Sequence, residues 1–182
     1  MAAETFLLVD GENIDATLGS LLGRRPAPEE RPRWDRVRDH LRAVWESPVR
    51  GLFFLNATAH VPGPFVQALD AIGYRPVLLS GPADVKVVDV AIQRTLGALL
   101  EHGGDVALAS HDGDFAPQMA ALADAGGRRL GVMGFRELIS LQLSELGLEL
   151  FDLEDDVGAF TVALPRVRVV PIEEFDPWAL LR

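Results

Sequence analysis

Short apolar runs alternate along the chain with longer segments in which apolar residues recur at helical spacing. The apolar runs have the length of strands and lie at residues 5–10, 51–56, 75–80, 105–110, 129–134 and 148–153. The helical segments lie at residues 13–22, 34–46, 63–72, 86–102, 115–125 and 136–145. This alternation predicts a three-layer α/β fold: a doubly wound, mainly parallel sheet of about five to six strands, with helices on both faces.

The pattern changes after residue 158. The remaining segment contains Pro165, Pro171 and Pro177, and proline is confined to the edges of sheets. We therefore expect one domain over residues 1–158, followed by a C-terminal extension over 159–182 that forms an edge strand and docking arm. Its apolar stretch at 167–172 predicts a strand added to the edge of a second copy, and hence a homodimer.

Composition narrows the possible chemistry. The 182 residues contain no cysteine, which excludes disulfides, thiolate nucleophiles and sulfur-bound zinc but leaves Mg²⁺ or Mn²⁺ held by carboxylates. No apolar run is long enough to span a membrane, and the N-terminal stretch lacks a signal-peptide pattern, so we expect a soluble, cytoplasmic protein with no membrane partner. The formal net charge of −10 argues against a broad basic surface for nucleic acid, although a local basic channel remains open.

An acidic residue stands at the end of the first predicted strand. In doubly wound sheets, ligands bind outside the carboxyl ends of strands, near the point where strand order reverses. Asp10 occupies such an end, and Asn13 opens the next helix, where its amide can cap that helix or orient the carboxylate. The alternative is that Asp10 only ends a strand and Asn13 only caps a helix.

A second acid lies in a helix with apolar residues nearly all round. Asp89 would be largely buried there, and a buried carboxylate needs a cation or hydrogen-bond donors to compensate its lost hydration. Lys86 stands three residues earlier, on the same helical face. The alternative is a simple ion pair between Lys86 and Asp89 without catalytic meaning.

The most specific motif follows the fourth predicted strand. This strand runs into Ser110, and Asp112 and Asp114 follow two residues apart, so extended backbone would point both carboxylates the same way. Two like charges held together repel, which indicates a divalent cation between them. The alternative is an Asp-rich turn that caps a helix. By the same alternation, His111 would point away from the carboxylates, outside the site.

A proline-rich, charged loop at residues 24–33 must return toward the carboxyl ends of the strands, because the helix before it runs away from them. This path would bring Arg31, Arg33 and Arg36 toward the site, where arginines can contact the phosphates of a nucleic acid.

Taken in order, these motifs resemble the NYN domain of the PIN-like nuclease superfamily over roughly residues 5–155. The family pattern is a strand-ending Asp with an Asn three residues later, a Lys before a helical Asp, and a Ser-x-Asp-x-Asp-Phe segment. The matching residues are Asp10, Asn13, Lys86, Asp89, Ser110, Asp112, Asp114 and Phe115. One departure is Val87, where many relatives carry a small residue such as Gly.

The resemblance implies a PIN-like fold and a divalent-metal-dependent nuclease that hydrolyses the phosphodiester bonds of RNA, with single-stranded RNA as the expected partner. The implied catalytic and metal-binding residues are Asp10, Asp89, Asp112 and Asp114. Asn13 and Ser110 would orient these ligands, and Lys86 would contact the scissile phosphate. Two alternatives stay open: a non-catalytic RNA-binding or protein-interaction module, and a Toprim-type metal-dependent phosphotransfer enzyme, although Toprim domains usually start with Glu.

Overall fold

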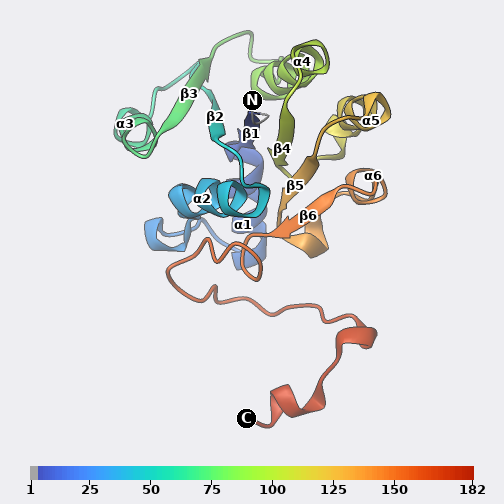
Figure 1. Ribbon diagram of the computed structural model, residues 1–182. Coiled ribbons are helices and arrows are strands. Elements are labelled where there is room, and N and C mark those ends of the chain that lie inside the picture. Colours follow the sequence, from blue (N-terminus) through green and yellow to red (C-terminus); the bar gives the residue numbers. More distant parts are fainter. Residues whose placement is uncertain (1–3) are drawn as a thin grey trace.

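The computed structural model describes residues 4–182 and has three layers, with a central sheet between two layers of helices (Figure 1). All six strands are parallel and lie in the order β3-β2-β1-β4-β5-β6. Their bounds are β1 (Thr5–Asp10), β2 (Val49–Asn56), β3 (Tyr74–Leu79), β4 (Asp105–Ala109), β5 (Leu130–Gly134) and β6 (Glu149–Asp152). The predicted fold class is confirmed. Residues 1–3 of the predicted domain lie outside the described residues.

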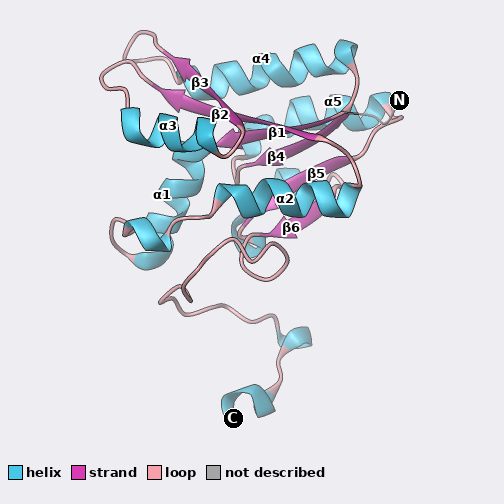
Figure 2. Cartoon of the chain, turned by 60° about the vertical axis from the view of Figure 1, so that its left-hand side comes forward, coloured by secondary structure: helices cyan, strands magenta, loops and turns pink. Residues whose placement is uncertain are grey.

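Helices cover both faces of the sheet (Figure 2). One face carries α1 (Gly11–Leu22), α2 (Trp34–Trp45) and α3 (Gly63–Ala71), and the other carries α4 (Val87–His102), α5 (Ala116–Ala125) and α6 (Leu141–Ser144). Successive β1 side chains serve opposite faces: Leu7 and Val9 join the first core cluster, and Phe6 and Leu8 join the second. A strand buried on both faces is apolar throughout, which explains the continuous apolar runs in the sequence.

The helix predicted at residues 136–145 is broken. A short 3₁₀ turn at Arg136–Leu138 is followed by extended backbone at Ile139 and then by the four-residue α6. Tertiary hydrogen bonds account for the interruption, because the backbone N–H of Ser140 donates to the His111 carbonyl and that of Arg136 donates to the Asp152 carboxylate. The Ser140 bond replaces the helical one to the Arg136 carbonyl, and the Ser140 side chain caps a new helix.

The strand order places a switch point beside β1. From β1 the chain moves outward through β2 to β3, then crosses to the other side of β1 at β4 and moves outward to β6. Loops leaving β1 and β4 therefore diverge to opposite faces, and the crevice between them is where such sheets bind ligands. In the part of the chain from residue 4 onward, no helix has the length and apolar character required to cross a membrane.

The C-terminal extension does not form the predicted edge strand within this chain. Residues 159–182 contain only the 3₁₀ turns Ile172–Glu174 and Pro177–Leu180. Ala159 and Leu164 are buried against the domain, whereas the residues after 168 run away from it (Figure 1). The three prolines remove backbone donors that a strand needs. The addition of residues 167–172 to a second copy stays a prediction.

Candidate metal centre

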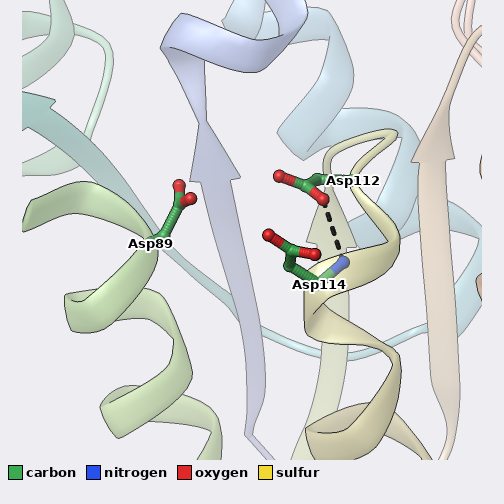
Figure 3. A group of neighbouring side chains, drawn as sticks. All are labelled: Asp89, Asp112 and Asp114. Carbon is green, nitrogen blue, oxygen red and sulfur yellow. Dashed lines mark hydrogen bonds between the residues drawn. The ribbon is translucent and has the colours of Figure 1, made fainter. Parts of the chain in front are cut away.

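Three carboxylates converge at the carboxyl end of the sheet. Asp89, Asp112 and Asp114 each offer an oxygen, and these oxygens lie within 4.8 Å of one another (Figure 3). Asp89 comes from the start of α4, and the other two follow β4, so the group forms at the switch point between opposite-running connections. Three negative charges at this spacing repel one another, and a bound cation would relieve that repulsion.

Asp10 lies beside this group but outside it. Its side chain is buried at the end of β1, and both of its oxygens accept hydrogen bonds, from the Asn13 backbone N–H at 3.3 Å and from the Ser110 hydroxyl at 3.1 Å. The pKa of Asp10 is raised to about 6, chiefly by burial and to a smaller extent by the charges of Asp89 and Asp112, whereas the two hydrogen bonds lower it. Asp10 thus caps α1 and adds buried negative charge next to the other three acids.

Asp112 and Asp114 converge by a turn and not by extended backbone, so the predicted geometry is wrong although the convergence is correct. Asp112 precedes the 3₁₀ turn Gly113–Phe115, and its Oδ1 accepts the backbone N–H of Asp114 at 2.9 Å (Figure 3). The Ser110 hydroxyl oxygen accepts the N–H of Asp112 while the hydroxyl donates to Asp10. At Gly113, a Cβ would lie 2.1 Å from Gln142 Oε1 and 2.5 Å from Ser140 Oγ, so a larger residue here would require these side chains to shift.

Asp89 is less enclosed than the sequence predicted. Its side chain is 20% exposed, because it lies in the first turn of α4 at the rim, and α4 buries one face only, through Val88, Ile92, Leu96 and Leu99. Burial and the nearby Asp112 raise the pKa of Asp89. Lys86 immediately precedes the helix and places its Nζ 3.8 Å from Asp89 Oδ2, with most of its side chain in solvent. The weak pairing leaves this ammonium group available to an anion.

A pocket of about 370 Å³ lies between most of these groups, although Asp114 is not part of its wall. Asp10, Asn13, Lys86, Asp89 and Asp112 all contribute to its wall. Glu12 also lines the pocket, and the sequence did not predict this role. In the sequence, Glu12 is only an acidic residue in the first turn of a helix, and it becomes part of the pocket because β2 pairs with β1. The Glu12 carboxylate accepts the backbone N–H of Asn56 at 3.3 Å, which fixes it at the pocket rim.

His111 points away from the carboxylates, as predicted, yet it supports the site. The backbone N–H of Phe135 donates to its Nε2 at 2.8 Å, so Nε2 is unprotonated and Nδ1 carries the proton. Nδ1 and the His111 backbone N–H both donate to Asn13 Oδ1, at 2.9 and 2.8 Å. Burial lowers the pKa of His111 to about 4, which keeps the ring neutral. Because Oδ1 is occupied, Asn13 presents its amide N–H groups to the pocket.

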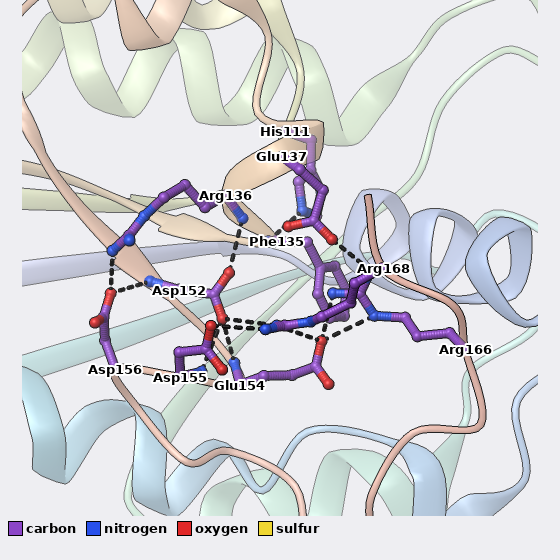
Figure 4. A network of polar contacts seen from close by, with 10 residues as sticks. All are labelled: His111, Phe135, Arg136, Glu137, Asp152, Glu154, Asp155, Asp156, Arg166 and Arg168. Atoms are coloured by element: carbon purple, nitrogen blue, oxygen red, sulfur yellow. Dashed lines mark hydrogen bonds and ion pairs between the residues drawn. The ribbon is translucent and has the colours of Figure 1, made fainter. Parts of the chain in front are cut away.

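The C-terminal extension contacts Phe135, which packs against His111 (Figure 4). Arg166 is almost fully buried; it pairs with Glu137 and Glu154, and its guanidinium lies over the Phe135 ring at 5.3 Å from the centroid. Phe135 in turn stacks on His111, with ring centroids 5.6 Å apart. Residues 159–168 therefore pack on the domain, as a docking arm would.

The three predicted arginines separate in space. Arg31 binds Asp15 at 2.7 Å and lines a groove next to the acidic pocket. Arg33 pairs loosely with Asp35 at 3.4 Å, and Arg36 donates to the carbonyls of Gly158 and Phe160. Arg36 thus anchors the start of the C-terminal extension, and among the three only Arg31 lines either of these two cavities.

Comparison with known proteins supports the fold alone. No protein-family model matches the chain, and no curated protein matches it. A similar solved structure is a protein of unknown function from Vibrio parahaemolyticus, with a TM-score of 0.67 and 20% sequence identity. The match covers 86% of this chain and 96% of that one, so the architecture extends over nearly the whole domain.

Proposed function

We propose that this chain is a divalent-metal-dependent nuclease that hydrolyses single-stranded RNA. The observation that carries the proposal is the convergence of Asp89, Asp112 and Asp114 within 4.8 Å at the switch point of a doubly wound sheet. The resemblance of these motifs to the NYN pattern adds the expected substrate.

The donor set fits a hard cation. All three groups offer carboxylate oxygens, without sulfur or imidazole, and such ligands suit Mg²⁺ or Mn²⁺. A divalent ion held there would lower the pKa of an attacking water and neutralise charge that develops on the phosphate.

The surrounding side chains then have distinct tasks. Asp89, Asp112 and Asp114 would hold the ion, and Asp10 would hold the Ser110 hydroxyl that fixes the turn before Asp112. Asn13, oriented by His111, would donate to a water or a phosphate oxygen from its free amide group. Lys86 would attract the phosphate, since its ammonium group lies in solvent at the mouth of the pocket.

Cleavage of a 5′-labelled single-stranded RNA in Mn²⁺ and in Mg²⁺ tests the proposal. We expect cleavage that EDTA stops and that Asp112→Asn slows by about a hundredfold or more, because the variant loses a charged ligand. Asp124→Asn is the matched control, since this exposed acid lies on α5, away from the pocket.

Three outcomes would overturn the proposal. Binding of RNA without turnover in either metal would favour the non-catalytic module. Turnover of a phosphate monoester but not of RNA would favour a phosphotransfer enzyme of the Toprim type. Equal cleavage by the wild type and Asp112→Asn would assign the activity to a contaminant.

A further inference from the structure

A second groove lies directly beside the acidic pocket. It has a volume of about 370 Å³, and Glu12 lines both cavities, so they are separated only by the first turn of α1. Its remaining wall comes from the loop before α2, the end of β2 and the start of α3. The groove therefore adjoins the proposed cleavage site at the same rim of the sheet.

The lining of this groove is mostly apolar and aromatic. Phe65 is 38% exposed, and its ring packs edge-to-face on buried Phe53 at 5.4 Å between centroids. Phe53 is itself held edge-to-face by Trp34 at 5.1 Å, so the Phe65 ring has a firm backing. A fixed aromatic ring with one solvent-facing side is the platform on which proteins stack unpaired bases.

Two arginines stand at the groove. Arg31 is partly neutralised by Asp15. Arg25 is exposed, and its guanidinium has no ion-pair partner among residues 4–182. An unpaired guanidinium beside an apolar platform suits a ligand with one flat apolar part and one anionic part, and a nucleotide has both.

We propose that this groove binds the base of the unpaired nucleotide next to the phosphate held in the acidic pocket, with the base against Phe65 and the nucleotide's other phosphate near Arg25. This assignment rests on the proposed nuclease function and deepens it, since it gives a structural reason for a single-stranded substrate. A base in a duplex is paired and stacked and would have to leave the helix to enter the groove.

Another occupant has suitable chemistry. Residues 172–178 of the C-terminal extension carry exposed Phe175 and Trp178 among acids, and a second copy of the chain could insert them. The shared wall with the acidic pocket favours the nucleotide, and the experiment separates the two occupants.

The test is fluorescence anisotropy of two labelled probes of equal length, an oligouridine RNA and an abasic ribose-phosphate oligomer, in Ca²⁺ to suppress turnover. Phe65→Ala should weaken oligouridine binding about tenfold and leave the abasic oligomer unchanged, and Phe65→Trp should restore binding. Phe175→Ala is the matched control, because it removes a comparably exposed ring (48% exposed) outside the groove. Arg25→Gln should weaken both probes alike.

An equal effect of Phe65→Ala on both probes, or no effect on either, would overturn the proposal. So would a concentration-dependent dimer that Phe65→Ala and Phe175→Ala both dissociate, since the tail would then be the occupant. If the protein cleaves RNA but Phe65→Ala causes no selective loss of oligouridine binding, the groove assignment is wrong and the proposed nuclease function still holds. If Phe65→Ala selectively weakens oligouridine binding but the protein cleaves no RNA, the nuclease function is wrong and the groove remains a nucleotide-binding site.

Discussion

Two buried ionisable residues at the rim respond to pH in opposite directions. The pKa of Asp10 is raised to about 6, so keeping it ionised costs stability. That cost is absent below about pH 4 and grows as the pH rises through 6. The pKa of His111 is lowered to about 4, so its neutral form stabilises the fold above the unfolded value of 6.5, and this contribution falls as the pH drops toward 4.

Replacement of Asp10 by Asn should stabilise the metal-free protein at neutral pH. The amide oxygen can keep one of the two hydrogen bonds, and the amide NH2 can donate to the Ser110 hydroxyl oxygen in the reverse direction. Because the variant carries no buried charge, we expect the free energy of unfolding at pH 7.5 to rise by roughly 1–3 kcal/mol. Urea unfolding in EDTA at pH 7.5 and 4.5 measures this, and the gain should shrink at pH 4.5. Asp70→Asn, at an exposed position, should stay within about 0.5 kcal/mol of the wild type. A loss of stability at both pH values would contradict the stated cost of ionising Asp10.

Replacement of His111 by Ala should destabilise the fold by about 2–4 kcal/mol, because it opens a cavity and leaves Phe135 N–H and Asn13 Oδ1 without their ring partners. Chemical denaturation provides the measurement. The exposed His60 offers a comparison, since His60→Ala should change little. Similar values for the two variants would mean that the buried contacts of His111 contribute nothing.

At the scale of elements, the connection after β4 illustrates how local and tertiary forces combine. Asp112 and Ser110 make a tight turn that starts the 3₁₀ helix, and these bonds are local. The side chains of Ser140 and Gln142 pack closely on Gly113, so a larger residue there would have to displace them. The two acids therefore meet because of both a local turn and a distant chain segment.

The C-terminal extension divides into an anchored part and an exposed part. Arg166 and Arg168 pair with acids around the end of β6, whereas Val167, Val169 and Ile172 face solvent. Dimerisation through the exposed part remains a prediction, which sedimentation of the full chain against a chain ending at 168 would check.

Two truncations should separate these parts. A chain that ends at residue 168 should unfold within about 1 kcal/mol of the full chain, because it keeps the anchor. A chain that ends at 158 should lose roughly 3 kcal/mol or more, since it gives up the burial of Leu164 and leaves Glu137 and Glu154 without Arg166. Thermal and urea unfolding compare them, and equal stability of the two truncations would contradict the anchoring role of residues 159–168.

For the whole molecule, a net charge of −10 combined with clustered acids means that the folded state should gain from cations. Mn²⁺ that binds only the folded chain should stabilise it by about 3 kcal/mol at a hundredfold excess over its dissociation constant. A thermal shift series with increasing Mn²⁺ measures this gain. Asp112→Asn should abolish most of the shift and Asp124→Asn should retain it. An identical shift in both variants would point to nonspecific screening.

Much of the architecture follows from local pattern. Strands buried on both faces must be apolar, and helices packed on one side must repeat every three to four residues, so the positions of Asp10 and Asp112 at strand ends were readable from the sequence. Their approach also followed, because the carboxyl ends of parallel strands share one edge.

Other features depended on contacts between distant segments. The sequence does not specify that the Asn13 side-chain oxygen would accept hydrogen bonds from His111 or that Glu12 would line two cavities. Nor does it specify that the Arg166 guanidinium would lie over the Phe135 ring. Periodicity reports which face of an element is buried, whereas the partner across that face is selected by the packing of the whole chain. The sequence by itself thus determined the layers and the acidic edge, and only the tertiary structure decided how the site is supported and what lies beside it.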